Sequence, residues 1–589
     1  MRATRSVLLL AAIAATWAAQ SDGARAQTAN TLPAERHKQV DAIFAPWAGS
    51  TAPGCAVGIS SDGKLDYARG YGMSNLEYDI PITPDSVFHT ASISKQFTAF
   101  SIALLAQEGK LSLDDDIRKY VPEIPDYSGP DYSGPDQNKA ITIANLIHHT
   151  NGLREQGQLL NLSGWRGDDI YTEDDILWAL GRQRSTNFEP GAEVIYGNAA
   201  YTLLGLIVRR VSGKSLRAFA DERIFKPLGM ADTHFRDDHT EVVPRRASAY
   251  TPRTGGGWQI SVPNIDHYGS TSLLTTVGDL LKWEQNLIDG RIGGKALVAS
   301  MQTSGRLNDG TETRYGGGLH LTGYRGLRRV RHDGADGGYR SEAALFPDQR
   351  LAIVALCNGG TIAPTDLVNK VAELYLSDRM TAPALAPAVE MPVAEQSTLA
   401  GNYWSPQTDE VVRLEWKDGA LRQVGTPAAF VPVGGGTFRP GELPHEWRFV
   451  PPAAGAPAVA QPELRIKDAW PTERVFTRMT APMPTASALA KFAGQYRSDE
   501  TDTTYTVRIA DGKLMLAWPR AYDIALDAVG GDRFLGSRGT VTFTRKASGE
   551  VDGLTISNRR LRRLHAERLA VTDKPATPAI TIMGEMRGR

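Results

Sequence analysis

The pattern of apolar and polar positions predicts an N-terminal region that mixes strands with helices. Two apolar runs flank a Ser61-Asp62-Gly63-Lys64 turn, which predicts a hairpin because Asp-Gly accommodates the positive φ of a tight turn. A helix is predicted from about Ser92 to Gln107, and its nearly all-round apolar surface predicts a buried, central position. Later patterns predict two more helices and a final pair of strands: Asn198–Gly213, Thr275–Gly290, and strands joined at Pro347-Asp348. This order indicates an α+β domain whose antiparallel sheet is completed by both ends of the segment.

The pattern changes to short alternating strands and glycine turns beyond a Pro/Ala-rich linker at 379–396. Leu399-Ala-Gly-Asn-Tyr403 recurs as Phe492-Ala-Gly-Gln-Tyr496, and Asp418-Gly419 recurs as Asp511-Gly512, at one offset of 93 residues (399 to 492, 418 to 511). A shared offset predicts a duplicated all-β module, read as two small antiparallel barrels. The predicted boundaries are 31–378 for the first domain, 397–479 and 488–572 for the barrels, 480–487 for a second linker and 573–589 for a tail.

The first 26 residues have the features of an export signal. Arg2 and Arg5 precede an apolar stretch at Val7–Ala19 and the small-x-small site Ala24-Arg25-Ala26. A membrane anchor would need roughly 20 uninterrupted apolar residues, so a cleaved signal and a periplasmic or secreted protein with no membrane span are expected.

Charge narrows the choice of partners. Lys and Arg number 65 against 66 for Asp and Glu, a net charge of -1, which provides no excess to attract nucleic acid or anionic lipid. We therefore expect a small-molecule or short-peptide substrate. The two cysteines, Cys55 and Cys357, are too few for a disulfide framework or zinc site. Two buried thiols and a single bridge between the first and last strands of the sheet both stay open.

Ser92 and Lys95 have the spacing of a nucleophile and its base. A separation of three residues in the first helical turn puts both side chains on one face, beside backbone N–H groups without intrahelical partners. A lysine there loses solvation and gives up its proton more readily. The alternative is an N-cap serine with a lysine reaching solvent. The same S-x-x-K spacing occurs at Ser61 and Lys64, where it is only a turn.

Four ordered motifs resemble the serine β-lactamase and penicillin-recognising hydrolase family, in particular its class C-like branch of D-aminopeptidases and esterases. They are ASISKQFTAF around Ser92, LIHHTNGL at Leu146–Leu153, Tyr196-Gly197-Asn198 and His332-Asp333-Gly334. The resemblance covers Ala34–Ser377. It implies a β-lactamase/transpeptidase-like antiparallel sheet flanked by helices, with the two C-terminal modules as lipocalin-like barrels.

The resemblance also implies the residues of an acyl-transfer site. Ser92 would be the nucleophile, Lys95 and Tyr196 would share the proton transfers with an ammonium-stabilised phenolate, and Asn198 would orient Lys95 and the substrate. The backbone N–H groups of Ser92 and Ala335 would form the oxyanion hole. Gly334, Asn198 and His332 would contact the substrate.

His332 departs from the lysine with which penicillin-recognising members meet a substrate carboxylate. Because histidine is at most partly charged near pH 7, strong selection for a carboxylate is in doubt, and the resemblance points to D-aminopeptidase or esterase members. The alternative for Tyr196 and Asn198 is a cap on the following helix, because asparagine is a favoured N-cap, and this role is compatible with the catalytic one. His148 and His149 lack further ligands nearby, which favours packing over metal binding.

The sequence therefore predicts an exported serine hydrolase of small amides, peptides or esters, with a D-stereospecific aminopeptidase among the candidates. A carboxylesterase, a β-lactamase and a non-catalytic envelope-binding protein are the alternatives. No cofactor and no metal is expected, and a homo-oligomer stays open. Tryptophans of the barrels are read as module core: Trp404, Trp416, Trp447, Trp470 and Trp518.

Overall fold

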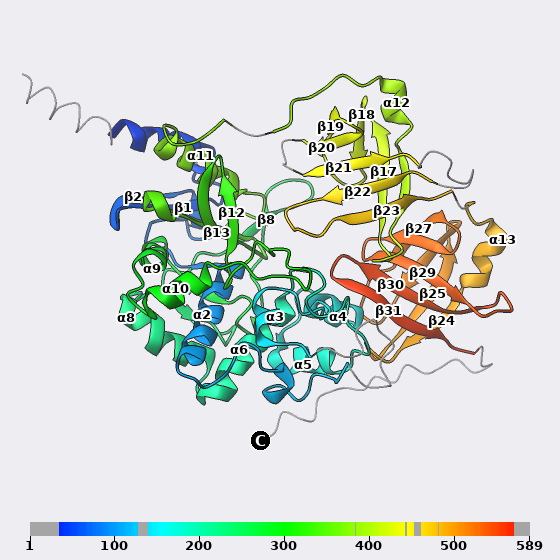
Figure 1. The fold of residues 1–589 in the computed structure, drawn as a ribbon, viewed down its shortest axis with the longest axis horizontal. Coiled ribbons are helices and arrows are strands. Elements are labelled where there is room, and N and C mark those ends of the chain that lie inside the picture. Colours follow the sequence, from blue (N-terminus) through cyan, green and yellow to red (C-terminus); the bar gives the residue numbers. More distant parts are fainter. Residues whose placement is uncertain are drawn as a thin grey trace, which may run out of the picture.

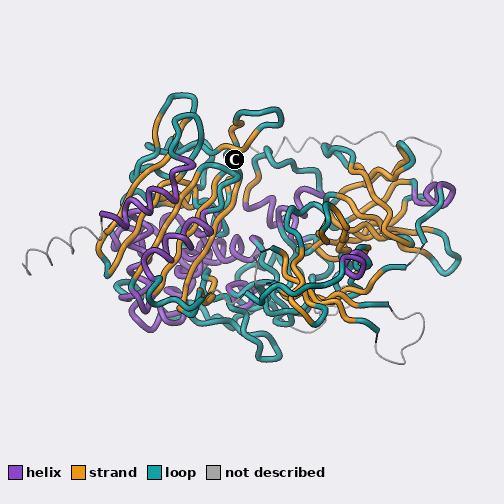
Figure 2. Tube along the Cα trace, turned by 90° about the horizontal axis from the view of Figure 1, so that it is seen from above, coloured by secondary structure: helices purple, strands orange, loops and turns teal. Residues whose placement is uncertain are grey.

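The computed structural model describes residues 34–127, 140–382, 385–441, 445–452, 461–480 and 482–570. The expected export signal, the tail from 573 and most of the repeated loop at 125–136 lie outside these residues. Figure 1 shows a mixed helix and strand domain beside two strand-rich modules, and Figure 2 shows the same division from above. Among the described residues, no helix combines the length and the apolar character needed to cross a bilayer.

The first domain is built on a six-stranded antiparallel sheet with the strand order β12-β13-β14-β15-β1-β2. The strands are β1(Cys55–Ser61), β2(Lys64–Tyr71), β12(His320–Tyr324), β13(Leu327–Asp336), β14(Tyr339–Phe346) and β15(Leu351–Cys357). The chain thus starts and finishes the sheet at its centre, where β1 pairs with β15 from Cys55 opposite Cys357 to Ser61 opposite Leu351. A disulfide joins Cys55 to Cys357, which resolves the choice that the sequence left open.

Helices cover both faces of this sheet because successive side chains of a strand point to opposite sides. In β1, Ala56 packs into the large core around α2(Ser94–Gln107), whereas Val57 and Ile59 pack into a smaller core under α11(Pro364–Leu376). The predicted hairpin, helices and closing strands are all present, with α6(Asn198–Ser212) and α9(Val277–Asp289) close to their expected bounds. The α+β prediction is confirmed.

The remaining elements of the domain are short. The helices are η1(Ala45–Trp47), η2(Ala91–Ile93), η3(Ile117–Lys119), α3(Ile143–Ile147), α4(Gln156–Leu162), α5(Glu173–Gly181), α7(Leu216–Ala220), η4(Asp221–Phe225), α8(Lys226–Leu228), α10(Gly294–Met301) and η5(Pro347–Gln349). The strands are β3(Met73–Asn75), β4(Ile80–Pro81), β5(Phe88–His89), β6(Tyr171–Thr172), β7(His234–Phe235), β8(Tyr250–Pro252), β9(Trp258–Ile260), β10(Ile265–Asp266) and β11(Leu273–Thr275).

Each C-terminal module is an eight-stranded antiparallel barrel, as predicted. The first contains β16(Gly401–Trp404), β17(Val411–Lys417), β18(Ala420–Gln423), β19(Phe430–Gly434), β20(Thr437–Pro440), β21(Glu446–Val450), β22(Glu463–Lys467) and β23(Arg474–Arg478), preceded by α12(Val393–Ser397). Its edge strands β18 and β19 meet at one bridge between Arg422 and Ala429. The second closes fully and contains β24(Gly494–Ser498), β25(Thr503–Ala510), β26(Lys513–Ala517), β27(Ile524–Gly530), β28(Arg533–Gly536), β29(Gly539–Arg545), β30(Val551–Asn558) and β31(Leu561–Arg568), preceded by α13(Ala486–Leu489) and η6(Ala490–Phe492).

The 93-residue repeat of the sequence reappears in the hydrogen bonds of the two barrels. The Tyr403 hydroxyl donates to the carbonyl oxygen of Leu399 at 2.9 Å, and the Tyr496 hydroxyl donates to that of Phe492 at 2.7 Å. The Asp-Gly pairs likewise form the β17–β18 and β25–β26 turns, each with both residues at positive φ. The repeated residues are therefore those that fix how each barrel begins and turns.

Buried ion pairs connect the second barrel to the first domain. Arg154, which is 1% exposed, pairs with Glu500 of the barrel and also donates to the carbonyl oxygen of Arg562 at 2.9 Å. Arg562 in turn pairs with Glu193 at 2.8 Å. Because breaking such a pair leaves an uncompensated buried charge, the barrel is fixed in one position against the domain.

Candidate active site

Ser92 lies in the 3-10 turn η2, directly before α2, where the chain bends into the buried helix. Its side chain is half-buried, and the preceding residue, Ala91, has the unusual φ of 50° for a residue with a Cβ. The N-cap of α2 is Ile93, without a side-chain cap. Ser92 therefore does not have the capping role that the sequence left open.

Lys95 is buried completely and points at Ser92 rather than at solvent. Its Nζ donates to Ser92 Oγ at 3.1 Å, to Asn198 Oδ1 at 2.8 Å and to the carbonyl oxygen of Ser270 at 2.8 Å. Burial lowers the pKa of Lys95 to about 7, partly opposed by the charge of Glu155. A substantial fraction of this amine is thus neutral at neutral pH and able to accept a proton.

Tyr196 completes the cluster from the loop before α6. Its ring centroid lies 4.9 Å from Lys95 Nζ, and its hydroxyl oxygen is buried. Burial raises the pKa of Tyr196. The nearby Ser92 hydroxyl lowers this pKa, but the effect is smaller than that of burial, and the two groups do not form a regular hydrogen bond. The phenol therefore keeps its proton at neutral pH, in contrast to the phenolate that the resemblance implied.

Asn198 is the first residue of α6 and does not cap it, because the N-cap is Gly197. Its side-chain oxygen accepts from Lys95, and its backbone N–H donates to Glu155 Oε2 at 2.6 Å. Glu155 was not among the predicted site residues, although it lies only two residues after the LIHHTNGL motif. This carboxylate fixes the start of α6 and provides the largest electrostatic support for the Lys95 ammonium.

Strand β13 brings Gly334 and Ala335 against the turn that carries Ser92. A Cβ on Gly334 would lie 2.2 Å from the carbonyl oxygen of Thr90, so only glycine allows this approach. Asp336 pairs with Tyr339 across a two-residue turn, and the alternation of antiparallel pairs directs the N–H of Ala335 away from β14. The Ala335 N–H thus lies on the strand edge that faces the serine turn, which is compatible with an oxyanion donor.

His332 is buried and belongs to an aromatic cluster beside Tyr196. Its Nε2 lies 2.9 Å from the Tyr315 hydroxyl, and its Nδ1 lies 2.6 Å from the backbone carbonyl oxygen of the next residue, Asp333. Burial lowers the pKa of His332 to about 4. The imidazole is therefore neutral near pH 7, and it provides hydrogen bonds and ring contacts rather than a positive charge.

The other histidines of the motif pack as the sequence indicated. His148 Nδ1 bonds to the carbonyl oxygen of Tyr315 at 2.9 Å, and His149 Nδ1 accepts from Gly197 N–H at 3.4 Å. Nearby, His320 Nδ1 or Nε2, His332 and Asp333 come within 4.8 Å of one another. Both ring nitrogens of His332 and the Asp333 carboxylate already have protein partners, so this group is poorly suited to hold a metal.

Both barrels contribute side chains that the sequence patterns did not indicate. Trp470, on the β22–β23 connection, packs 6.3 Å from the Tyr196 ring and 5.6 Å from the His320 ring, so it is not barrel core. Arg560, on the β30–β31 turn, has its guanidinium carbon 5.3 Å from the centroid of the Tyr196 ring. The cluster around Ser92 is therefore lined by residues from the first domain and from both barrels.

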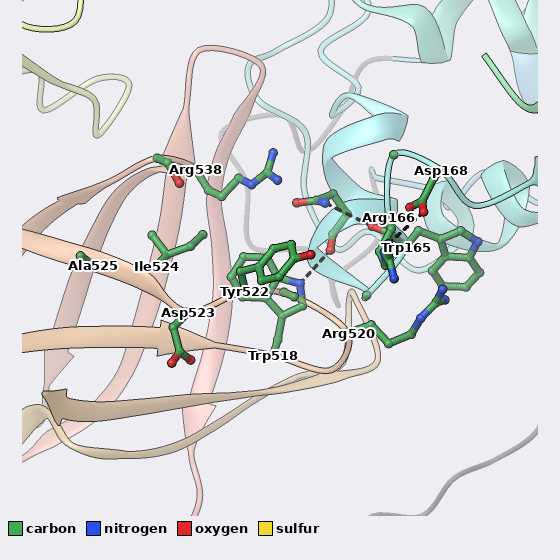
Figure 3. Close-up of a pocket in the computed structure, with 15 residues that line it drawn as sticks. Trp165, Arg166, Asp168, Trp518, Arg520, Tyr522, Asp523, Ile524, Ala525 and Arg538 are labelled. Atoms are coloured by element: carbon green, nitrogen blue, oxygen red, sulfur yellow. Dashed lines mark hydrogen bonds and ion pairs between the residues drawn. The ribbon is translucent and has the colours of Figure 1, made fainter. Parts of the chain in front are cut away.

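A separate cavity of about 560 Å³ lies between the second barrel and the loop after α4. Figure 3 shows Trp165, Trp518 and Tyr522 among its lining residues. Trp518 donates from its indole N–H to the carbonyl oxygen of Asn161 at 2.8 Å. Its lining includes none of the residues placed around Ser92 above, so the cavity is distinct from the Ser92 site.

Comparisons with known proteins identify the family and fold that this chain resembles. The family model described as Beta-lactamase matches residues 40–377. A D-aminopeptidase of Gluconobacter oxydans is 26% identical over 470 residues, 78% of this chain and 82% of the relative. A D-aminopeptidase of Brucella anthropi is 26% identical over 370 residues, 62% of this chain and 65% of the relative, just under two thirds of its length. The structure of the octameric penicillin-binding protein homologue from Pyrococcus abyssi is 22% identical in sequence and aligns with a TM-score of 0.51. The alignment covers 83% of this chain and 98% of the homologue, which shows a shared fold.

Proposed function

Because the chain belongs to the beta-lactamase family over residues 40–377, we propose that it is an exported serine hydrolase that cleaves small amides, peptides or esters through an acyl-enzyme on Ser92. The observation that carries this proposal is the 3.1 Å contact between Lys95 Nζ and Ser92 Oγ in a buried setting that lowers the pKa of the amine to about 7. The D-aminopeptidase relatives make amides and peptides the first substrates to test.

In the proposed acylation, neutral Lys95 accepts the hydroxyl proton while Ser92 Oγ bonds to the substrate carbonyl carbon. The N–H groups of Ser92 and Ala335 stabilise the resulting oxyanion, at about 3 kcal/mol for each well-placed donor. Tyr196, which keeps its proton, donates it to the leaving amine or alkoxide and is reprotonated by the Lys95 ammonium. The acyl-enzyme then reacts with water by the same transfers in reverse.

Asn198 and His332 would act by position rather than by proton transfer. Asn198 holds Lys95 in place through the 2.8 Å bond from Nζ. His332, neutral and bonded to Tyr315, shapes the wall of the pocket. A neutral group at this position supports amide and ester substrates over those selected by a cation on β13, such as β-lactams. Esterase and D-aminopeptidase activity both fit this arrangement.

Covalent labelling tests the proposal directly. A fluorophosphonate probe followed by peptide mass mapping should label Ser92 in the wild type and fail to label Ser92→Ala. The matched control is Ser61→Ala, which removes the serine of the other S-x-x-K spacing, at the end of β1. Labelling should be unchanged in that variant. A folded wild-type protein that is not labelled would contradict the proposal.

Turnover assays then separate the finer alternatives. D-Ala-p-nitroanilide and L-Ala-p-nitroanilide compare stereochemistry, p-nitrophenyl butyrate reports esterase activity and nitrocefin reports β-lactamase activity, each with Ser92→Ala as the blank. Faster turnover of the D-anilide would support an aminopeptidase. Ligand binding without turnover or labelling in the wild type would instead support the non-catalytic binding protein.

A further inference from the structure

The turn between β30 and β31 carries Arg560 into the wall of the Ser92 site. Its carbonyl oxygen accepts from Glu155 N–H at 3.1 Å and from Asn187 Nδ2 at 3.1 Å. Both donors belong to the first domain, and Glu155 itself bonds to the start of α6. Glu155 therefore fixes the backbone of both Arg560 and Asn198, although some 360 residues separate these two positions in the chain.

The Arg560 guanidinium is held over Tyr196 without an acceptor. Among the described residues, no carboxylate or carbonyl oxygen accepts a hydrogen bond from it, and the residue is half-buried. The neighbouring Arg559 differs, because its guanidinium pairs with Asp468 at 2.8 Å. An arginine has five N–H donors in a planar fork that matches a carboxylate, and cation–π contact with a ring satisfies none of them.

The charges around Ser92 leave Arg560 as a cation with free donors. Lys95 donates to three protein acceptors, and the Glu155 carboxylate is bonded to the N–H of Asn198. His332 is neutral near pH 7 because burial lowers its pKa to about 4. Arg560 still acts on the cluster electrically, since its charge lowers the pKa values of Lys95 and Tyr196. β13 carries the neutral His332 where penicillin-recognising members carry a lysine, and the second barrel instead provides the positive charge of Arg560.

We propose that Arg560 is a specificity-determining residue that binds a carboxylate on the substrate, so that this hydrolase prefers acidic amides or esters over neutral or amine-bearing ones. The inference rests on the proposed function and narrows its substrate class. It also separates this chain from a plain aminopeptidase, because a free α-ammonium group beside Arg560 would meet a like charge at short range.

Matched substrate pairs test this preference. One pair places the carboxylate in the leaving group, 4-acetoxybenzoate against 4-acetoxybenzamide. The other places it in the acyl group, the 4-nitrophenyl esters of terephthalic acid and of terephthalamic acid, whose rigid rings prevent self-catalysis. The measured quantity is the ratio of kcat/KM for the acid to that for the amide at pH 9, where Lys95 is neutral. Charge-assisted pairing predicts a ratio of about ten to a hundred in one pair for the wild type.

Variants assign the preference to one side chain. Arg560→Gln should reduce the ratio to about one, and Arg560→Glu should reverse it, whereas the matched control Arg559→Gln should keep it. Ratios near one in both pairs for the wild type, or a wild-type ratio kept by Arg560→Gln, would overturn the proposal. Because each ratio compares two substrates on one protein, a general loss of activity does not alter it.

A binding measurement keeps this test separate from the catalytic proposal. Calorimetry on Ser92→Ala with 4-acetamidobenzoate and 4-acetamidobenzamide, non-reactive analogues of the first pair, should show tighter binding of the acid. Addition of Arg560→Gln should remove that difference. Labelled Ser92 without any acid preference would refute the role of Arg560 alone, whereas acid-selective binding by an unlabelled wild type would refute the hydrolase alone.

Discussion

The protonation of Lys95 should control the rate at which Ser92 is acylated. The amine is buried, and its pKa falls from 10.5 to about 7. At pH 7.4 this shift raises the neutral fraction by a factor of about 900, and the difference between the two pKa values itself corresponds to about 5 kcal/mol. The base is therefore available because of burial, and the site would be almost inactive near neutrality if Lys95 titrated like a solvated lysine.

The direction of the pH dependence follows from this shift. Since the neutral amine is the reactive form, the second-order rate of fluorophosphonate labelling should rise about tenfold per pH unit below pH 7 and level off above it. His332, with a pKa of about 4, titrates below this range, and Tyr196, whose pKa is raised, titrates above it. The measurement is the labelling rate between pH 5.5 and 9.5, with folding checked by circular dichroism at each pH.

Variants around the amine sharpen the test. Asn198→Asp would place a carboxylate at the atom now 2.8 Å from Lys95 Nζ, which favours the ammonium and should move the inflection up by about 1 to 3 pH units. Lys38→Met, at a lysine that is 76% exposed, should leave it in place. A wild-type inflection above pH 9, or one that ignores Asn198→Asp, would refute Lys95 as the base.

Three further changes probe the surroundings. Gly334→Ala would place its Cβ 2.2 Å from the carbonyl oxygen of Thr90, so the labelling rate should fall at least tenfold. In the control Gly323→Ala, the added Cβ would lie 3.6 Å from its nearest atom, so the labelling rate should not change. Equal labelling rates in the two variants would refute the need for a close approach at Gly334. Glu155→Gln removes the main charge that supports the ammonium and should shift the pH inflection downward by about one unit; an upward shift in the same labelling assay would contradict this. Replacing both Cys55 and Cys357 by Ala opens a loop with a sequence separation of 302. This change should lower the free energy of unfolding by up to about 5 kcal/mol and should lower the midpoint of urea unfolding. An unchanged midpoint would show that the pairing of β1 with β15 stabilises the sheet without the disulfide.

The sequence predicted the parts of the site that local geometry determines. A spacing of three residues at a helix start is enough to bring Ser92 and Lys95 together, and the structure gives a 3.1 Å contact. The duplication in the C-terminal half was predictable for a similar reason, since Tyr403 and Tyr496 bond within their own modules. Tyr196 and Asn198 were predicted only through the family resemblance, because nothing local links them to Lys95.

Contacts between distant segments could not be predicted in this way. Glu155 resembles any polar residue in a loop, and its role depends on where α6 begins in space. Trp470 and Arg560 lie in turns whose sequence shows only that the chain reverses direction, so their approach to Tyr196 follows from how the barrels dock. The protonated state of Tyr196 could not be predicted from the sequence either, because the pKa of a phenol depends on how completely the surrounding segments bury it.

The docking of the β30–β31 turn beside Ser92 has a consequence for biosynthesis. Ser92 and Lys95 are translated some 465 residues before Arg560 (95 to 560). During synthesis from the N-terminus, the earlier domain emerges before the final hairpin that walls its pocket. A nascent chain that has not yet reached the β30–β31 turn therefore contains the Ser92–Lys95 pair but lacks the guanidinium beside Tyr196.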